Sequence, residues 1–239
     1  MVDLSKLTKW ELGKVFDFSV LPKNSTEEDI RKGCRLAKQY NCASFYASTN
    51  YWLPVMKEEL AGSDVHLGVG LAFPFGGNTA YMKGLETEEA VRMGATALDL
   101  VMNIGALRSK RYDDVKEELR VFKEAAQGNI TKVIIEVNFL TDEEIATACK
   151  LIAEAGIDYA KTSSGQFEGP SMEQFLVMKE TLKGTSVKLK VAGVKFPRPQ
   201  NAYAFIMAGA DLIGTRAAPQ IIDAFDQMRE IGIVPKYNG

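Results

Sequence analysis

Three titratable side chains stand within otherwise apolar stretches of this sequence. They are Asp99 in ATALDLVMNIG, Lys161 in IDYAKTSSG and Lys190 in SVKLKVAGV. An uncompensated charge in an apolar strand is costly, so such a residue needs a reason to be there. A carboxylate and two amines can bind a carbonyl compound and transfer its protons, which makes these residues the first candidates for chemistry.

The two lysines are predicted to converge. Lys161 and Lys190 fall at the ends of the sixth and seventh predicted strands, and neighbouring strands lie about 4.8 Å apart. One ammonium group lowers the pKa of the other, and burial acts in the same direction. A neutral lysine amine is the form that attacks a carbonyl to give a Schiff base. The pair therefore indicates covalent catalysis through a lysine.

Two alternatives stay open for these lysines. A lysine at a strand end commonly extends its side chain to solvent and has no catalytic role. Lys188 also shares a strand face with Lys190, because side chains along a strand alternate with a period of two. Lys188 lies earlier in the strand, and the sequence leaves open whether it reaches the opposite mouth of the fold.

The elements that must position these residues alternate along the chain. Short apolar or β-branched runs, typical of strands covered by helices, are predicted at 14–20, 43–47, 66–72, 97–103, 132–137, 159–162, 187–191 and 212–215. Helical patterns lie between and after them, at 26–40, 50–60, 79–93, 112–127, 141–155, 172–181, 199–208 and 219–231. Ser25 and Glu28 have the spacing of a capping box for the first of these helices. Glycines expected to end helices are Gly94, Gly128, Gly156 and Gly209.

This alternation favours one fold. Strand–helix units with right-handed crossovers form either an open doubly wound sheet or a closed barrel. Eight units in 239 residues, with no G-x-G-x-x-G motif after the first strand, predict an α/β protein with a (β/α)8 TIM barrel, as a single domain over residues 1–239. In such barrels the active site lies at the carboxyl ends of the strands, which is where Lys161 and Lys190 are predicted.

Composition argues against several classes of function. The net charge is −2 with acidic and basic residues interspersed, so we expect no nucleic-acid partner and no membrane attraction. No apolar run reaches the roughly 18 residues of a membrane span. The only histidine, His66, is expected at the amino-terminal mouth of the barrel, which argues against a zinc site and a Ser-His-Asp triad.

The three cysteines, Cys34, Cys42 and Cys149, show neither metal-type spacing nor a disulfide framework. We expect them to be buried thiols of a cytoplasmic protein, because disulfides are rare in a reducing compartment. Schiff-base chemistry requires no metal and no organic cofactor, so neither is expected.

Several segments together resemble one enzyme family. DLVMNIGAL at 99–107 is followed by KVIIEVNFLTDEEI, AGIDYAKTSSG and KLKVAG, and preceded by FPFGGNT and LETEEAVRMGA. In order and spacing, over residues 12–218, this series resembles the deoxyribose-phosphate aldolases. The resemblance implies that Lys161 forms the Schiff base, that Lys190 lowers its pKa, and that Asp99 transfers protons through a water. It also implies a small phosphorylated sugar or aldehyde as substrate, and a possible homodimer.

The loops expected to hold phosphate depart from the family pattern. After the seventh strand the family has Ser-Gly-Gly, an apolar residue and Arg; here Gly193 remains, between Ala192 and Val194. After the eighth strand, Gly214 is followed by Arg216 and Ala217, where the family has serine. Lys195 and Arg216 are expected to supply compensating positive charge. The alternatives are a surface salt bridge for Arg216 and a solvated side chain for Lys195.

The first two strands and the tail differ as well. The family motif Asp-His-Thr-Leu-Leu reads Asp17-Phe18-Ser19-Val20-Leu21, and the resemblance implies that Asp17 keeps its place facing the substrate. The alternative for Asp17 is a structural cap ahead of Pro22. Phe45-Tyr46-Ala47-Ser48 replaces a cysteine-containing pattern. Tyr237 resembles a tail tyrosine that assists proton transfer in some members, with a disordered tail as the alternative.

Three hypotheses follow. The first is a class I aldolase that acts on 2-deoxyribose 5-phosphate and gives glyceraldehyde 3-phosphate and acetaldehyde. The second is a related Schiff-base aldolase with another donor or acceptor, because the phosphate loops differ. The third is a non-catalytic barrel that binds a phosphorylated sugar or a partner protein. Retention of Asp99, Lys161 and Lys190 together disfavours the third, since a binding module has no need of buried, coupled amines.

Overall fold

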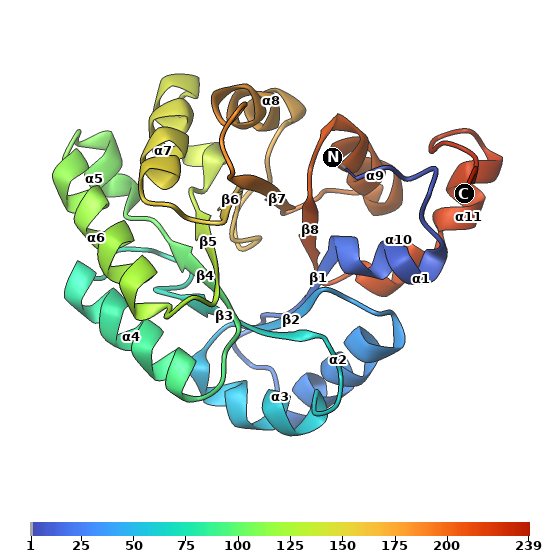
Figure 1. The fold of residues 1–239 in the computed structure, drawn as a ribbon, viewed down its shortest axis with the longest axis horizontal. Coiled ribbons are helices and arrows are strands. Elements are labelled where there is room, and N and C mark those ends of the chain that lie inside the picture. The colour runs from blue at the N-terminus through green and yellow to red at the C-terminus, as the bar shows by residue number, and fades with distance from the viewer. Residues whose placement is uncertain (1) are drawn as a thin grey trace.

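The computed structural model describes residues 2–239 and has eight parallel strands at its centre (Figure 1). The strands are β1 (Phe16–Val20), β2 (Ser44–Ala47), β3 (His66–Leu71), β4 (Ala97–Val101), β5 (Ile130–Ile134), β6 (Tyr159–Lys161), β7 (Lys188–Ala192) and β8 (Leu212–Thr215). They pair in chain order, and β1 also pairs with β8, which closes the barrel. The predicted (β/α)8 barrel is confirmed, with a strand at each predicted position.

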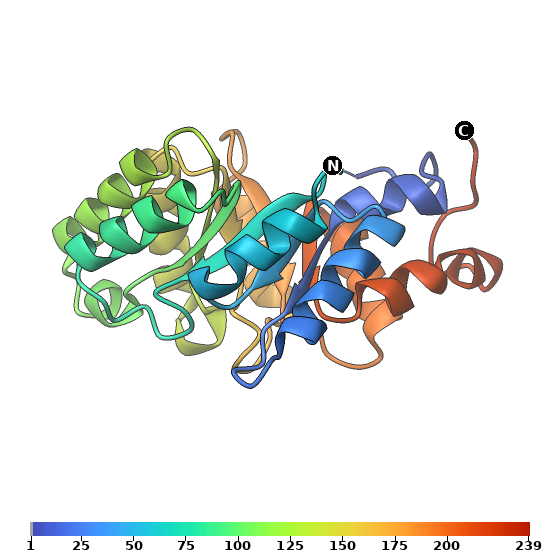
Figure 2. The same cartoon turned by 90° about the horizontal axis from the view of Figure 1, so that it is seen from below.

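Helices surround the barrel on the outside (Figures 1 and 2). The longer ones are α2 (Glu27–Gln39), α3 (Leu53–Glu59), α4 (Ala80–Arg92), α6 (Tyr112–Ala125), α7 (Asp142–Glu154), α8 (Met172–Thr181) and α9 (Arg198–Ala208). The short ones are α1 (Lys9–Leu12), α5 (Ile104–Arg108), α10 (Ala218–Asp223) and α11 (Phe225–Glu230), with 3₁₀ turns η1 (Gly13–Val15), η2 (Asn50–Trp52) and η3 (Val137–Phe139). Within residues 2–239, no helix has the length and apolar character needed to cross a membrane.

The predicted capping box of α2 is wrong by one residue. Thr26, not Ser25, is the N-cap: its hydroxyl accepts the Asp29 amide at 3.3 Å, and the Asp29 carboxylate accepts the Thr26 amide at 2.8 Å. Ser25 instead closes a turn, because its amide and its hydroxyl both donate to the carbonyl of Pro22. Ser25 and Glu28 have the same spacing as Thr26 and Asp29. Because the turn that starts at Pro22 uses Ser25, the capping box forms at Thr26.

Other helix boundaries also differ from the prediction. The fourth strand was predicted to run to 103, but it ends at Val101, and the Asn103 side chain caps the unpredicted helix α5 by accepting the Ala106 amide at 3.0 Å. The last predicted helix, 219–231, is divided at Ala224 into α10 and α11. Three of the four predicted helix-ending glycines are confirmed, since Gly94, Gly156 and Gly209 end their helices with φ between +66° and +116°. After α6 the left-handed position next to the C-cap is Gln127, and Gly128 follows it.

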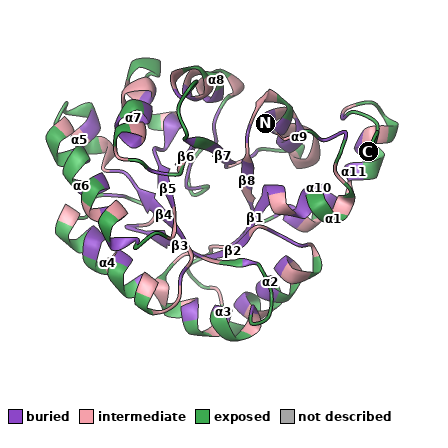
Figure 3. Ribbon diagram, in the orientation of Figure 1, coloured by how far each residue is buried: buried purple, intermediate pink, exposed green. Residues whose placement is uncertain are grey.

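Burial follows the barrel walls and the inner faces of the helices (Figure 3). The strands are buried along nearly their whole length: all five residues of β4 are buried, as are four of five in β7. A strand enclosed on both faces tolerates charge only when a partner is present. Every ionisable side chain that points into this barrel must therefore find its counterion inside it.

A buried ion pair lies outside the barrel, between α4 and α6. The Lys83 side chain is fully buried, and its Nζ donates to Glu118 Oε2 at 2.5 Å and to the Val101 carbonyl at 3.0 Å. Glu118 Oε1 accepts the Asn103 amide at 2.9 Å. The pair thus satisfies one backbone group at the end of β4, the Val101 carbonyl, and one just past it, the Asn103 amide.

Removal of one partner should be strongly destabilising. Lys83→Met leaves the Glu118 carboxylate buried without its counterion, and the expected loss is about 3–5 kcal/mol in the free energy of unfolding. The double variant Lys83→Met/Glu118→Gln should lose less, because glutamine is neutral and still accepts the Asn103 amide. Urea unfolding of the two variants and the wild type measures both values. Equal losses in the single and double variants would contradict this account.

Candidate active site

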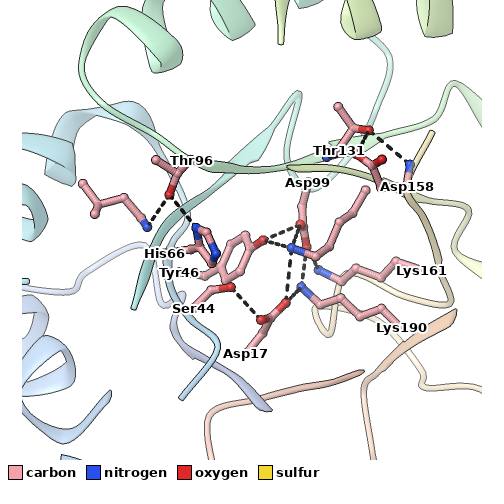
Figure 4. A network of polar contacts seen from close by, with 12 residues as sticks. Asp17, Ser44, Tyr46, His66, Thr96, Asp99, Thr131, Asp158, Lys161 and Lys190 are labelled. Atoms are coloured by element: carbon pink, nitrogen blue, oxygen red, sulfur yellow. Dashed lines mark hydrogen bonds and ion pairs between the residues drawn. The ribbon is translucent and has the colours of Figure 1, made fainter. Parts of the chain in front are cut away.

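The barrel brings the predicted catalytic residues together. Lys161 on β6 and Lys190 on β7 are direct partners in the strand register, and Asp99 lies on β4 two strands before β6. All three side chains point into the barrel, toward one another (Figure 4). Asp99 Oδ2 lies 2.7 Å from the Nζ atoms of both lysines, so one carboxylate oxygen is shared by two amines.

Asp17 on β1 completes this arrangement from the other side. Its Oδ2 lies 2.7 Å from Lys190 Nζ, and its Oδ1 accepts the Ser44 hydroxyl at 2.7 Å. Asp17 is 1% exposed and its carboxylate contacts Ser44 and Lys190 on other strands, so the alternative of a structural cap for the turn ahead of Pro22 is wrong. Its carboxylate belongs to the same buried network as Asp99 (Figure 4).

Two members of the network were missed in the sequence. Lys132 on β5 is 1% exposed, and its Nζ lies 3.5 Å from Asp17 Oδ2 and 3.8 Å from Asp99 Oδ1. Tyr46 on β2 donates its hydroxyl to Asp99 Oδ1 at 2.7 Å and accepts from Lys132 Nζ at 2.6 Å. A signal was present in the sequence, since Lys132 stands in a predicted buried strand; the structure adds that it pairs with Asp99 in the register of β4 and β5.

The two predicted amines differ in their charged neighbours. Burial is the main cause that lowers the pKa of Lys161, to about 8; the nearby Lys190 ammonium lowers it further, while Asp99 opposes the shift. Burial also disfavours the charged form of Lys190, but contact with both Asp17 and Asp99 leaves its pKa raised. Lys161 contacts only one carboxylate. Of the pair, Lys161 is therefore the one poised to lose its proton near neutral pH.

The carboxylates stay ionised. Burial would raise the pKa of Asp99, but Lys161, Lys190 and Lys132 together hold it well below its ordinary value. The same balance lowers the pKa of Asp17, with Lys132 and Lys190 as the opposing cations. Lys190 also lies over the Tyr46 ring, 4.1 Å from its centroid, a favourable cation–π position.

A cavity of about 580 Å³ opens above the network at the carboxyl ends of the strands. Besides the catalytic candidates, all the residues predicted to bind substrate line it: Asp17, Gly193, Lys195, Gly214 and Arg216. Gly214 has a second role, because a Cβ atom there would lie 2.9 Å from Lys190 Cε. Its missing side chain leaves the space that Lys190 occupies.

The cations at the cavity mouth are not equivalent. Lys195 is exposed and paired with Glu168 at 2.5 Å, so its charge is locally balanced. Arg216 makes no salt bridge to any residue in the described range 2–239, contrary to the surface-pair alternative. Arg198, which was not predicted, also lines the cavity, and its guanidinium stacks on the Phe196 ring at 4.2 Å.

The remaining candidates lie away from this cavity. His66 is exposed at the start of β3, where its Nδ1 lies 3.1 Å from Thr96 Oγ1. Lys188 is exposed at the start of β7 and lies over the Tyr159 ring, so it faces the opposite mouth. Tyr237 packs near Arg229, and the adjacent Asn238 amide bonds to Ser5, so the tail is held beside the amino-terminal segment (Figure 2).

The cysteine prediction is confirmed, since Cys34, Cys42 and Cys149 are free and buried. Burial raises the pKa of each thiol to about 12, which leaves it protonated and unreactive. Across residues 2–239, no group of three or more His, Cys, Asp or Glu side chains has the arrangement of a metal site.

Comparison with known proteins agrees with this geometry. The chain is 40% identical to the deoxyribose-phosphate aldolase of Streptococcus sanguinis over 213 residues (89% of this chain, 96% of that protein). It is 41% identical to the corresponding Clostridium novyi enzyme over 214 residues (89% and 95%). The tetrameric deoxyribose phosphate aldolase of Aeropyrum pernix superposes with a TM-score of 0.84 at 25% identity, over 94% of this chain and 95% of that one.

A further solved structure, the aldolase QR15, superposes with a TM-score of 0.84 at 30% identity, over 93% of this chain and 99% of that one. The family profile extends from the segment before β1 to the loop after β7, and thus includes Asp17, Asp99, Lys161 and Lys190. With residues 12–197 matched by the DeoC/LacD family aldolases and a buried lysine pair at the carboxyl ends of its strands, the chain belongs to that aldolase family.

Proposed function

We propose that this protein is a class I aldolase that cleaves and forms 2-deoxy-D-ribose 5-phosphate through a Schiff base on Lys161. The observation that carries the proposal is the lowered pKa of Lys161, about 8, beside a carboxylate that is kept ionised. The curated relatives named deoxyribose-phosphate aldolase support the choice of substrate. The products of cleavage are glyceraldehyde 3-phosphate and acetaldehyde.

The first step is attack of the neutral Lys161 amine on the substrate carbonyl. The nitrogen–carbon bond forms, the carbonyl oxygen takes a proton, and loss of water leaves an iminium ion. Asp99 is 2.7 Å from this nitrogen and can receive the proton that the amine gives up, directly or through a water. Lys190, whose pKa is raised, can serve as the acid that protonates the departing oxygen.

The iminium then accepts the electron pair of the breaking carbon–carbon bond. In cleavage, the substrate hydroxyl loses its proton and becomes the carbonyl of glyceraldehyde 3-phosphate, while the other fragment stays on Lys161 as an enamine. Protonation of the enamine carbon and hydrolysis by one water release acetaldehyde and restore the amine. Asp99 and Lys190 are the groups placed to move these protons.

The cavity mouth supplies the charge for a phosphate. Arg216, on the loop after β8, is free of carboxylate partners in the described chain, and it lines the cavity with Gly193 after β7 and Gly214 near the end of β8. An arginine can bind a phosphate through two parallel hydrogen bonds. The pairing of Lys195 with Glu168 favours a second candidate, a Schiff-base aldolase with another acceptor, because that cation is already balanced.

We further propose that the protein works in a reducing compartment, the cytoplasm, since its three buried thiols are unpaired. The tetrameric relative from Aeropyrum pernix supports assembly of several copies. A homodimer is the smallest assembly consistent with that proposal.

Schiff-base formation can be tested by trapping. Incubation with acetaldehyde and borohydride should add the mass of one reduced adduct, which peptide mapping should locate on Lys161. Lys161→Met should give no adduct and no turnover, yet keep its fold, because Asp99 still has Lys190 and Tyr46 as partners. Lys150→Met, which removes an exposed lysine of α7, is the matched control and should react normally. An adduct confined to surface lysines would refute the proposal.

The role of Lys190 can be tested by the pH dependence of trapping. In the wild type, the initial rate should rise with pH and level off above about pH 8, because only the neutral Lys161 amine reacts. Lys190→Met removes a nearby positive charge and leaves Lys161 as the one amine beside Asp99 Oδ2, so the pKa of Lys161 rises. The inflection should therefore move to higher pH, with a slower rate at neutral pH. An unchanged pH profile would count against this role.

Phosphate recognition can be tested with Arg216→Met. Hydrogen bonds to charged groups are worth about 1.5–3 kcal/mol, so kcat/KM for 2-deoxyribose 5-phosphate should fall roughly 10–100-fold. The value for unphosphorylated 2-deoxyribose should stay nearly constant. Arg92→Met, at the exposed end of α4, controls for loss of an arginine. Equal losses for both sugars would instead favour the alternative substrate.

A further inference from the structure

Glu136 has an unusual backbone conformation directly beside Lys161. It follows β5 with φ 48° and ψ 63°, in the left-handed region that a side chain other than glycine rarely adopts. Its neighbours hold it there: the Ile135 amide donates to the Lys161 carbonyl and the Val137 amide to the Thr162 carbonyl, both at 3.0 Å. A strained backbone at a residue other than glycine suggests that the side chain has a role.

The Glu136 side chain is buried, with 2% of the residue exposed. Its Oε1 accepts the backbone amide of Ser164 at 2.9 Å, and no hydrogen-bond partner for Oε2 lies among residues 2–239. Burial raises the pKa of this carboxyl, yet in either protonation state one oxygen can still accept the Ser164 amide. The contact is thus a single, well-formed bond from the end of β5 to the loop after β6.

That loop forms one wall of the cavity. Residues 164–169 all line it, and the loop begins three residues after Lys161. Its far end packs on the loop after β7 backbone to backbone, since a Cβ atom on Gly169 would lie 1.8 Å from the Gly193 carbonyl oxygen. Displacement of Ser164 would therefore be passed to Gly193 and to the cavity side that receives the substrate.

We propose that Glu136 is a positioning residue, which fixes the cavity wall at 164–169 through its bond to the Ser164 amide. Glu136 itself does not line the cavity, so it acts on the substrate only through this loop. The inference rests on the proposed function for its kinetic consequences. The loop geometry, however, can be measured without any turnover.

Glu136→Gly is the decisive variant, because glycine adopts the left-handed conformation without strain. Its melting temperature should equal or exceed that of the wild type, while hydrogen–deuterium exchange in the peptide that covers 162–170 becomes faster. KM for 2-deoxyribose 5-phosphate should rise at least about tenfold, with a smaller change in kcat. Borohydride trapping of acetaldehyde on Lys161 should proceed as in the wild type.

Two further variants separate positioning from general disturbance. Glu136→Gln keeps an oxygen for the Ser164 amide, so its exchange and KM should stay within about threefold of the wild type. Gln127→Gly relieves a left-handed residue of nearly the same φ, 49°, at the exposed end of α6, and should change neither measurement. The proposal would be overturned if Glu136→Gly showed the wild-type rate of hydrogen–deuterium exchange in 162–170. It would also be overturned if Glu136→Gly and Glu136→Gln changed exchange and KM equally. Loss of trapping in the wild type itself would refute the Schiff base, while the exchange data would still decide the role of Glu136.

Discussion

The Asp99 carboxylate, shared between two lysine amines, is the interaction on which the rest of the site depends. Its Oδ2 lies 2.7 Å from both Lys161 and Lys190, and its Oδ1 accepts the Tyr46 hydroxyl. Three buried lysines with only two carboxylates would leave an excess positive charge if all were ionised. Burial makes that excess costly and lowers the pKa of both Lys132 and Lys161, whereas two carboxylate contacts at 2.7 Å keep the pKa of Lys190 raised. The unequal sharing of carboxylates thus makes Lys161, which contacts one carboxylate, easier to deprotonate than Lys190, which contacts two.

Much of this arrangement could be predicted from the sequence. Apolar runs separated by amphipathic segments predicted all eight strands, and charges within those runs pointed to Asp99, Lys161 and Lys190. The reason is physical: burial of a charge in a strand is so costly that a charged residue within an apolar run stands out in the sequence. Asp17 was reached through the family resemblance, and its contact with Lys190 agrees with that placement.

What the sequence could not show depends on contacts across the barrel. The position of Lys132 in a buried strand was a signal, but its role was not visible, because its partners Asp17 and Tyr46 lie far away along the chain and meet it only in the closed barrel. The left-handed conformation of Glu136 has no signature in residue type. At the cavity mouth, Lys195 and Arg216 look alike in the sequence, and only the position of Glu168 shows which cation is already balanced.

The seam between β1 and β8 has a consequence for how the protein folds. Asp17, on the first strand, contacts Lys190, on the seventh, and the two are brought together only when β1 pairs with β8. Until that pairing forms, the lysines of β5, β6 and β7 have one buried carboxylate between them in place of two. An open barrel would therefore hold uncompensated charge in its interior, which penalises any partly closed intermediate. The charge network makes closure of the barrel more cooperative, and no fragment that lacks the first strand contains a complete active site.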